Sequence, residues 1–393
     1  MNEIVIISAV RTPVGRYGGS LKSLNSGQLG AIAIKEAIKR AGIEASQVDE
    51  VIIGEVRQST ESSNVARVAA LRAGVPETSP AFTINRLCAS GMQAIASAAQ
   101  QIGSGQTEIV VAGGTESMSN APIYLRNSRF GGDHAKLVDS NTEAGQQPHE
   151  IYGSQLGMGV TAENVAERFG ISREDQDAFA LESQRRAGAA IEAGKFDAEI
   201  VPVEITERKS RFIFTRDEHP RPETTIEALR KLKPVFKQNG TVTAGNACGR
   251  NDGAAALVLT SSSKANELGL RPIARIVDWA AAGVSPEVMG IGPVPAVKKL
   301  LARTGFSLNE IGLIELNEAF ASQALAAIRE LGLDQDKVNV NGGAIALGHP
   351  LGATGAKIVT TLIHEMLRRQ EKRGIATLCI GGGQGMAMMV ELL

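Results

Sequence analysis

The chain has 393 residues, of which 43% are hydrophobic and 21% are charged, and its formal net charge is −1. This length exceeds the size at which one hydrophobic core keeps growing, so two or more domains are expected. The near-zero charge excludes a general attraction to nucleic acid or to an anionic membrane surface. The three cysteines, Cys88, Cys248 and Cys379, fit neither a disulfide framework nor a CxxC metal spacing. We therefore expect reduced thiols and no metal site.

The amino-terminal segment MNEIVIISAVRTP lacks the basic region, apolar core and small-residue cleavage site of a secretion signal. Its pattern is typical of a first β-strand. No uninterrupted apolar stretch approaches the ~18 residues that a membrane span needs. The sequence therefore predicts a cytoplasmic protein that is not inserted in a membrane.

Short β-branched runs alternate with longer helical patterns in the first part of the chain, which is typical of βαβ units on a mostly parallel sheet. The helical pattern at 30–42 places apolar residues three and four apart and ends on Gly42. The strand candidates are residues 3–8, 50–54, 81–85 and 108–114.

The carboxyl-terminal part repeats this plan. Residues 293–316 have the same order of helix, glycine stop and strand as residues 30–56. Residues 337–343 match the strand at 81–85, and residues 376–383 match the strand at 108–114. The sequence thus predicts a duplication of two α/β halves of about 120 residues each, and not a solenoid, which needs at least three repeats.

The segment between the halves differs in composition. Residues 204–237 contain nine basic and six acidic residues and three prolines. Two interpretations stay open: a solvated surface excursion, or a mobile layer whose excess of Lys and Arg meets an anionic ligand. Residues 128–157 are polar and rich in glycine, which favours a loop, and helices are expected from Met158, with Ser172 and Asp175 as a capping signal.

Cys88 follows the strand candidate at 81–85 and opens a helical pattern of small apolar residues that should be buried between layers. The positive end of a helix dipole favours a thiolate, which makes Cys88 a candidate nucleophile. The alternative is an inert packing cysteine, because free cysteines are among the most buried residues.

The second half has a matching junction, where residues 338–340 lead through a glycine-rich turn to His349 and Pro350. Proline suits the first helical turn and disfavours helical geometry in the residue before it, so His349 is expected at the N-cap. A positive helix end lowers the pKa of an imidazole and keeps it neutral, as a general base requires.

Two further groups follow predicted strands. Cys379 ends an apolar run and meets the glycine-rich turn that contains Gly381, where free backbone N–H groups could form an oxyanion hole. Asn317 and Glu318 follow the apolar run at 312–316. Ligands of open α/β sheets bind at the carboxyl ends of strands, where all of these groups are expected.

Two phosphate-binding motifs are excluded. Residues 348–357 resemble a Walker A loop but lack the adjacent Gly-Lys-Ser/Thr, because Ala356 intervenes. No G-x-G-x-x-G follows the first strand, which excludes a Rossmann nucleotide-binding unit.

Together these motifs resemble those of the thiolase family along essentially the whole chain. The resemblance rests on NRLCASGMQAI (85–95), VAGGTESMSNAP (111–122), GTVTAGNACGRNDGAAA (240–256), NEAF (317–320), NGGAIALGHPLGATGA (341–356) and CIGGGQG (379–385). It implies a duplicated, layered α-β-α-β-α fold with two five-stranded mixed sheets and an inserted loop domain. The implied domains are an N-terminal half (1–120 with 241–270), a loop domain covering coenzyme A (121–240) and a C-terminal half (271–393).

The resemblance also implies a role for each matching position. Cys88 would carry the acyl group after His349 takes its proton, and Cys379 would exchange the α-proton of a second thioester. Asn317, through a bound water, and His349 would polarise one thioester oxygen, and the backbone N–H groups of Cys88 and Gly381 would hold the other.

The resemblance further assigns a pantetheine channel to Met158, Phe236, Ala244, Cys248, Ala319 and Phe320. Two departures stand out. Relatives have Ser where this chain has Cys248, and a thiol donates hydrogen bonds only weakly, while Arg250 replaces an aliphatic residue. Gly157 replaces a histidine that short-chain members carry, which opens room for longer or different acyl chains.

The implied activity is the interconversion of two acetyl-CoA with acetoacetyl-CoA and coenzyme A by a ping-pong mechanism. The resemblance also implies a homodimer or homotetramer with no permanently bound cofactor and no metal. A 3-ketoacyl-CoA thiolase of broader chain length is the alternative within the family. A decarboxylating ketoacyl synthase would have a histidine in place of Asn317. A non-catalytic acyl-CoA or lipid carrier would have no use for Cys88, His349 and Cys379 together.

Overall fold

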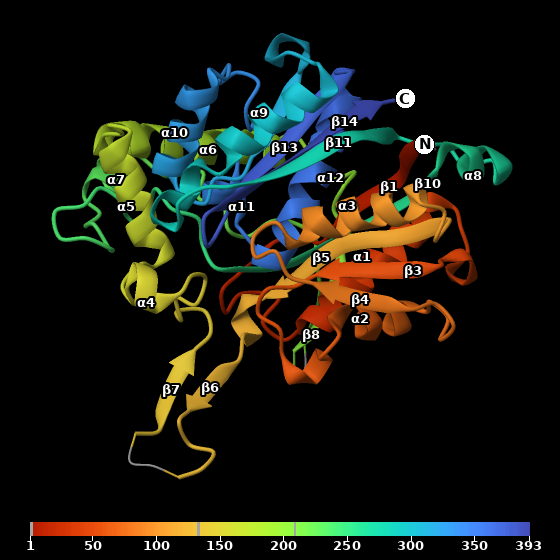
Figure 1. The fold of residues 1–393 in the computed structure, drawn as a ribbon, viewed down its shortest axis with the longest axis horizontal. Helices are drawn as coiled ribbons and strands as arrows, with labels where there is room; N and C mark the ends of the chain where they lie inside the picture. Colours follow the sequence, from red (N-terminus) through yellow and green to blue (C-terminus); the bar gives the residue numbers. More distant parts are fainter. Residues whose placement is uncertain (1–2, 132–133, 208–209) are drawn as a thin grey trace.

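The structure is a computed structural model that describes residues 3–131, 134–207 and 210–393. A long twisted sheet runs through the molecule with helices on both of its faces, and a hairpin of β6 and β7 projects from the body (Figure 1). Glu3 and Glu391, near the two ends of the described chain, both form ion pairs with Arg275 of β11 (Ala274–Gly283).

The strands of the main sheet follow the order β12-β13-β14-β11-β1-β10-β5-β3-β4, and the short β2 (Gly15–Arg16) pairs with β10. The first half supplies five strands, which are β1 (Ile4–Arg11), β3 (Glu50–Gly54), β4 (Ala81–Ile84), β5 (Ile109–Ser117) and β10 (Asn251–Ser261). The second half supplies β11 (Ala274–Gly283), β12 (Leu313–Leu316), β13 (Arg373–Ile380) and β14 (Gln384–Leu392). In each half, parallel pairs (β3 with β4 and β5, and β12 with β13) end at the site described below.

Three details of the sheet differ from the sequence-based expectation. Within the described residues, the second half supplies four strands instead of five. The two strand sets are not separate sheets, because β1 and β11 pair through two residue pairs, Val5 with Arg275 and Ile6 with Ala274. The expected strand at 337–343 is a turn in which Val338 forms one isolated bridge to Ile314. The physical reason is that this segment turns away at once: Asn339 has a φ of 47° and Gly342 a φ of 80°.

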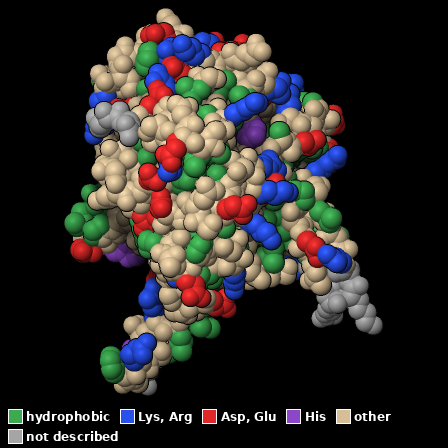
Figure 2. Space-filling model, turned by 90° about the vertical axis from the view of Figure 1, so that its right-hand side faces the viewer, with side chains coloured by type: hydrophobic (Ala, Val, Ile, Leu, Met, Phe, Trp, Pro, Cys, Tyr) green, Lys and Arg blue, Asp and Glu red, His purple; other side chains and the backbone are tan. Residues whose placement is uncertain are grey.

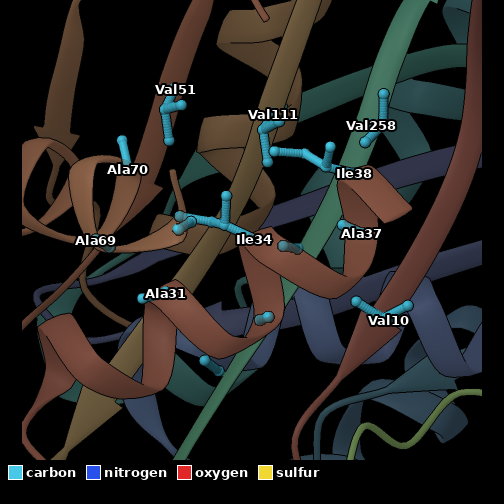
Figure 3. Packing of buried hydrophobic residues seen from close by; sticks show 14 of the residues in the cluster. Val10, Ala31, Ile34, Ala37, Ile38, Val51, Ala69, Ala70, Val111 and Val258 are labelled. Carbon is cyan, nitrogen blue, oxygen red and sulfur yellow. The ribbon is translucent and has the colours of Figure 1, made fainter. Parts of the chain in front are cut away.

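Helix α1 (Ser26–Ala41) begins four residues earlier than its apolar pattern indicated, because Asn25 and Gln28 form a capping box. It packs with α2 (Val65–Ala73) on one face of the first strand set, as Figure 3 shows for Ile34 and Ile38 against Val111 and Val258. In the second half, α9 (Pro293–Thr304) and α10 (Ala321–Leu331) pack with β12, β13 and β14 in a separate cluster.

Helices α3 (Ser90–Gly103) and α12 (Leu351–Arg369) share one core that includes residues from both strand sets. Small residues permit this close approach. A Cβ on Gly91 would lie 2.8 Å from the backbone nitrogen of Ala356, and one on Gly355 would lie 2.4 Å from that of Met92. The starts of both helices are thereby brought to the same place.

The described residues of 121–240 (121–131, 134–207 and 210–240) lie outside the main sheet. They form two hairpins, β6 (Ile123–Arg126) with β7 (Lys136–Asp139) and β8 (Val203–Glu207) with β9 (Ser210–Phe214), and the helices α4 (His149–Tyr152), α5 (Met158–Arg168), α6 (Arg173–Glu192) and α7 (Ile226–Arg230). The Ser172 hydroxyl accepts a hydrogen bond from Asp175 N, which confirms the predicted cap of α6. The remaining α-helices of the described residues are α8 (Ser262–Glu267) and α11 (Ala344–Leu347).

The buried Arg11 ties this inserted region to the sheet. Its guanidinium forms two hydrogen bonds with Asp217, of 2.7 and 2.9 Å, and a third with Glu199. On the face shown in Figure 2, Lys and Arg side chains are interspersed with Asp and Glu. Within residues 3–131, 134–207 and 210–393, no helix has the length and apolar character that crossing a membrane requires.

Candidate active site

A cavity of about 460 Å³ opens where the carboxyl ends of strands from both halves meet. The segments that follow β3, β4, β5 and β13 each contribute to its wall, as does the start of α12. Its lining includes Cys88, Cys379 and Gly381 from the strand ends and His349 from the segment before α12. The predicted channel residues in the lining are Met158, Phe236, Cys248, Ala319 and Phe320. Asn317 and Ala244 are not among the lining residues.

Cys88 lies in a tight turn between β4 and α3, two residues before the helix and not at its first position. Leu87, just before it, has a φ of 46°, which is uncommon for a residue with a side chain. The Ser90 hydroxyl stabilises this turn, because it donates to Leu87 O at 2.6 Å and accepts from Arg86 N at 2.9 Å. The turn therefore holds Cys88 at the cavity wall.

The thiolate of Cys88 is not favoured in the free site, contrary to the expectation from its helix terminus. Burial raises the pKa of the Cys88 thiol, while hydrogen bonds from the backbone N–H groups of Gly381 and Cys88 and the charge of Arg57 act in the opposite direction. A helix N-terminus stabilises a thiolate by roughly 0.3–1 kcal/mol, which is less than one pKa unit. Burial disfavours the thiolate and can raise its pKa by several units. At rest the Cys88 side chain is thus a thiol, and its deprotonation needs a base.

His349 is buried in the segment between α11 and α12, and the N-cap position predicted for it is occupied by Pro350 instead. Its backbone N–H donates to Asn251 Oδ1 at 2.9 Å. Its Nδ1 lies 2.6 Å from Thr354 Oγ1, and that hydroxyl donates its only hydrogen to Pro350 O at 2.9 Å. Nδ1 must therefore carry the imidazole hydrogen, and Nε2 has the free lone pair.

The free Nε2 of His349 is suited to accept a proton. It is buried and has no hydrogen-bond partner among the residues that the structure describes. Burial, with a smaller contribution from the positive charge of Lys357, lowers the pKa of His349 to about 3. The predicted neutral imidazole is confirmed, but burial is the main cause and not the helix terminus.

Cys379 is the penultimate residue of β13 and is almost completely buried. Burial raises its pKa well above the usual value, and the neighbouring thiols of Cys88 and Cys248 add to the effect. The turn that follows contains Gly381, whose position is crowded: a Cβ there would lie 3.1 Å from Gln146 Cγ and 3.3 Å from Met158 Sδ. Gly382 and Gly383, with φ of 77° and 85°, complete the turn.

Asn317 and Glu318 follow β12 but have different surroundings. Both polar atoms of the Asn317 amide are buried and have no hydrogen-bond partner among the described residues. The Glu318 carboxylate, by contrast, accepts hydrogen bonds from Ser183, Asn339 and Ile345 N, and so holds the turn before His349 against α6. Glu318 therefore has a structural role, whereas the Asn317 amide is free to bind a ligand.

The predicted channel residues lie on one side of the cavity. The rings of Phe236 and Phe320 form an edge-to-face pair with centroids 6.2 Å apart. A Cβ on Gly159 would lie 2.1 Å from Phe236 Cγ, so glycine is needed where α5 passes this ring. Cys248 donates its backbone N–H to Ala319 O, and burial raises the pKa of its thiol to about 12. Ala244 is exposed and lies outside the lining, although Thr243 and Asn246 in the same turn are buried.

Sequence reasoning missed the residues that hold the others in place. Thr354 and Asn251 position His349, as described above. The buried carboxylate of Glu116 accepts from the backbone N–H groups of Val56, Arg57 and Gly352, at 3.1, 3.0 and 2.8 Å. All three lie in the motifs quoted above. The partners of Asn251 and Glu116 are far away in the chain, whereas Thr354 lies only five residues after His349. The described residues form no group of three or more His, Cys, Asp or Glu side chains arranged to hold a metal ion.

Family comparisons agree with this geometry. Residues 4–263 match the model of the thiolase N-terminal domain, and residues 270–392 match that of the thiolase C-terminal domain. The chain belongs to the thiolase family. This thiolase is 53% identical to the acetyl-CoA acetyltransferase of Cupriavidus necator over 395 residues, which cover 100% of both chains.

Solved structures give the same result. A crystal structure of the Bacillus anthracis acetyl-CoA acetyltransferase matches this thiolase with a TM-score of 0.97 and 51% identity, covering 100% of this chain and 99% of the other. A crystal structure of human mitochondrial 3-ketoacyl-CoA thiolase in complex with CoA matches with a TM-score of 0.95 and 45% identity, covering 100% and 98%. The expected fold class is thereby confirmed.

Proposed function

We propose that this thiolase is an acetyl-CoA acetyltransferase, which joins two acetyl-CoA molecules into acetoacetyl-CoA and coenzyme A and also runs in reverse. The observation that supports this most directly is the meeting of Cys88, the free Nε2 of His349 and Cys379 in one cavity. A binding protein has no need for a nucleophile, a neutral base and a second buried thiol at one place.

In the first half-reaction, Nε2 of His349 takes the proton of Cys88, and the thiolate attacks the carbonyl carbon of acetyl-CoA. The backbone N–H groups of Cys88 and Gly381 stabilise the negative oxygen that develops. The bond to the coenzyme A sulfur then breaks. Cys379, which its raised pKa keeps protonated at rest, supplies the proton to that leaving thiolate.

In the second half-reaction, the Cys379 thiolate removes the α-proton of another acetyl-CoA, and the carbanion attacks the acetyl group on Cys88. The Cys88 thiolate leaves and regains its proton from the His349 imidazolium, so the proton balance closes. Asn317, through a bound water, and His349 polarise the oxygen of the second thioester. The buried, unpartnered Asn317 amide supports this role.

The inserted region, residues 121–240, supplies Met158 and Phe236 to the cavity wall and is the proposed cover for coenzyme A. The edge-to-face pair of Phe236 with Phe320 supports an apolar channel for the pantetheine arm. Ala244, which is exposed outside the cavity lining, is proposed to contact the arm only where it leaves the cavity.

Two substitutions test the assignment. Cys88→Ala should abolish both thiolysis of acetoacetyl-CoA and the exchange of acetyl groups between coenzyme A molecules. Cys379→Ala should stop carbon–carbon bond formation and cleavage but leave acetyl exchange measurable at a lower rate. Exchange needs no α-proton transfer, and the coenzyme A thiolate is a good leaving group that can take its proton from water when Cys379 is absent. Loss of exchange in a folded Cys379→Ala variant would contradict the division of roles.

A 3-ketoacyl-CoA thiolase of broader chain length is the second candidate. The likeness to the human 3-ketoacyl-CoA thiolase and Gly157 in the cavity lining support it. Measuring kcat/KM for thiolysis of acetoacetyl-CoA, 3-oxohexanoyl-CoA and longer homologues distinguishes the two. A rise of kcat/KM with chain length would favour the second candidate.

We also propose that the enzyme is a homodimer or homotetramer. Strand β4 is an edge of the main sheet and its residues are only half-buried, which leaves backbone groups that a second copy can pair with. The projecting hairpin exposes Ile123, Leu125 and Leu137 by 67%, 56% and 72%. Light scattering gives the mass that tests this, and a monomer would contradict it.

A further inference from the structure

Two buried carboxyl groups, those of Glu55 and Glu116, lie beside residues 56–57 of the cavity lining. Glu55 directly follows β3 and Glu116 lies near the end of β5, which is the parallel neighbour of β3 in the sheet. The two residues are only 1% and 0% exposed. Two neighbouring carboxyl groups in such a place do not both ionise unless donors or cations compensate both charges.

The compensation is given to Glu116. Its Oε2 accepts the backbone N–H groups of Val56 and Gly352, at 3.1 and 2.8 Å, and its Oε1 accepts that of Arg57 at 3.0 Å. Gly352 lies in the first turn of α12, where the helix dipole favours a negative charge. Burial raises the pKa of Glu116, but these N–H groups and the charge of Arg57, which also acts on Cys88, have the opposite effect. Glu116 is therefore the member of the pair that is suited to a negative charge.

The surroundings of Glu55 favour a neutral carboxyl group. Its Oε2 is buried and has no hydrogen-bond partner among the described residues. The elements packed around Glu55 present the Glu116 carboxylate on β5, the Ser26 hydroxyl at the start of α1, and the backbones of Ile84 at the end of β4 and Gly352 on α12. Burial, and then the charge of Glu116, raises the pKa of Glu55 to about 8, with Ser26 acting in the opposite direction. Glu55 is therefore protonated at pH 7.

The Glu116 carboxylate connects this pair to the base of the active site. Through Gly352 it holds the first turn of α12, and Thr354 in that turn accepts the Nδ1–H of His349 at 2.6 Å. Through the backbone of residues 56–57 it holds a segment that lines the same cavity. A second negative charge beside Glu116 would repel it from these N–H groups, and the segments that it joins would separate.

We propose that Glu55 and Glu116 hold one proton between them near neutral pH, and that loss of this proton at alkaline pH releases the start of α12 and displaces His349. Glu116 is a positioning residue in this scheme, and Glu55 is the pH-sensitive member of the pair. This inference rests on the proposed thiolase activity, because it concerns the placement of the base that deprotonates Cys88.

The test compares the wild type with Glu55→Gln, which keeps the shape of the protonated carboxyl group but cannot ionise. The quantity measured is kcat/KM for thiolysis of acetoacetyl-CoA, as the ratio of wild type to variant between about pH 6 and pH 9. This ratio cancels the ionisation of coenzyme A and of Cys88, which both enzymes share. It should be constant below about pH 7 and fall about 10-fold by pH 9, because about one Glu55 in ten is still protonated one unit above its pKa.

Two further variants sharpen the comparison. Glu50→Gln is the matched control, since Glu50 is a half-buried carboxyl group at the other end of the same strand, and its ratio to the wild type should not change with pH. Glu116→Gln should lower kcat/KM at every pH, because part of an amide donates hydrogen bonds where three backbone N–H groups need an acceptor.

Two readouts do not depend on catalysis. Because the folded pKa of Glu55 is raised from 4.5, the stability that its protonated form contributes is fully present below about pH 4.5 and is lost as the pH rises to about 8. The urea midpoint of the wild type should therefore fall relative to that of Glu55→Gln over this range and then stay constant relative to it. Infrared spectroscopy of the wild type alone should show a buried protonated carboxyl group at pH 7 that is largely ionised by pH 9, which tests the pair even where a variant does not fold.

The outcomes separate this inference from the proposed activity. Cleavage of acetoacetyl-CoA with a ratio of wild type to Glu55→Gln that stays constant up to pH 9 would overturn the inference and leave the activity intact. An equal fall of the ratio for Glu50→Gln would also overturn it, because a general effect of charge would then be the cause. Absence of a protonated carboxyl group at pH 7 would refute the shared proton. No cleavage by the wild type at any pH would overturn the proposed activity itself, while the urea and infrared measurements would still decide whether the pair holds a proton.

Discussion

The hydroxyl of Thr354 decides which nitrogen of His349 is the base, and Thr354→Val tests this. Valine has nearly the same shape but cannot accept a hydrogen bond, so the buried Nδ1–H of His349 loses its partner at 2.6 Å. An unpaired buried donor costs about 1–3 kcal/mol, so the Nδ1–H tautomer loses the advantage that Thr354 gives it. The imidazolium that forms when Nε2 takes the proton of Cys88 also keeps a buried Nδ1–H without an acceptor, which makes this proton transfer less favourable by a similar amount. At 1.4 kcal/mol per factor of ten, kcat/KM should fall about 5- to 150-fold.

The assay is steady-state thiolysis of acetoacetyl-CoA, with the rate of Cys88 alkylation by iodoacetamide as a second readout. Both should fall together, because each needs the thiolate. Thr354→Ser should restore most of the activity. Thr360→Val is a matched control on the same helix, since the Thr360 hydroxyl is buried and makes no hydrogen bond among the described residues. An active Thr354→Val variant, or an equal loss in Thr360→Val, would refute the tautomer argument.

Three further predictions concern packing, the buried ion pairs and pH. Gly159→Ala should raise the KM for coenzyme A substrates several-fold with little change in Tm. The reason is that the new Cβ displaces the Phe236 ring, which is 43% exposed, from the channel. An unchanged KM would contradict the channel assignment. Arg11→Met should lower the free energy of unfolding by about 3–5 kcal/mol, because it leaves the carboxylates of Asp217 and Glu199 buried without their cation. Urea unfolding at pH 7 measures this loss, and a loss below about 1 kcal/mol would argue against the stabilising role of the buried ion pairs. Because the folded pKa of His349 is lowered to about 3, the unfolded chain binds the extra proton between about pH 6.5 and 3. The contribution of neutral His349 to the free energy of unfolding is therefore fully present above pH 6.5. It falls by roughly 1.4 kcal/mol per pH unit as the pH decreases below that value. From pH 6.5 down to 4.5, the free energy of unfolding of the wild type should decrease relative to that of His349→Gln. A difference between the two that stays constant over this range would contradict a buried neutral imidazole.

The alternation of strands and helices was predictable because it depends on residues close together in the chain. The apolar spacing at 30–42 and the cap at Ser172 both lie within elements that the structure contains. The start of α1 was missed because a polar capping box, Asn25 with Gln28, extends the helix beyond its apolar pattern. The expected strand at 337–343 failed because Asn339 and Gly342 turn the chain before a ladder can form.

The sequence by itself also determined the kind of chemistry, since its motifs carry the reactive groups of the site. The thiols of Cys88 and Cys379 and the imidazole of His349 line the cavity, and the amide of Asn317 lies two residues before the lining residue Ala319. Only the tertiary structure decided their protonation and placement. Cys88 was expected to favour a thiolate, but desolvation by segments distant in sequence outweighs the helix terminus. Glu116 carried no local signal, because its role depends on the backbone N–H groups of Val56, Arg57 and Gly352, which lie far from it in the chain. A pKa or a free charge is a property of everything packed around a group, and most of those neighbours are far away in the chain.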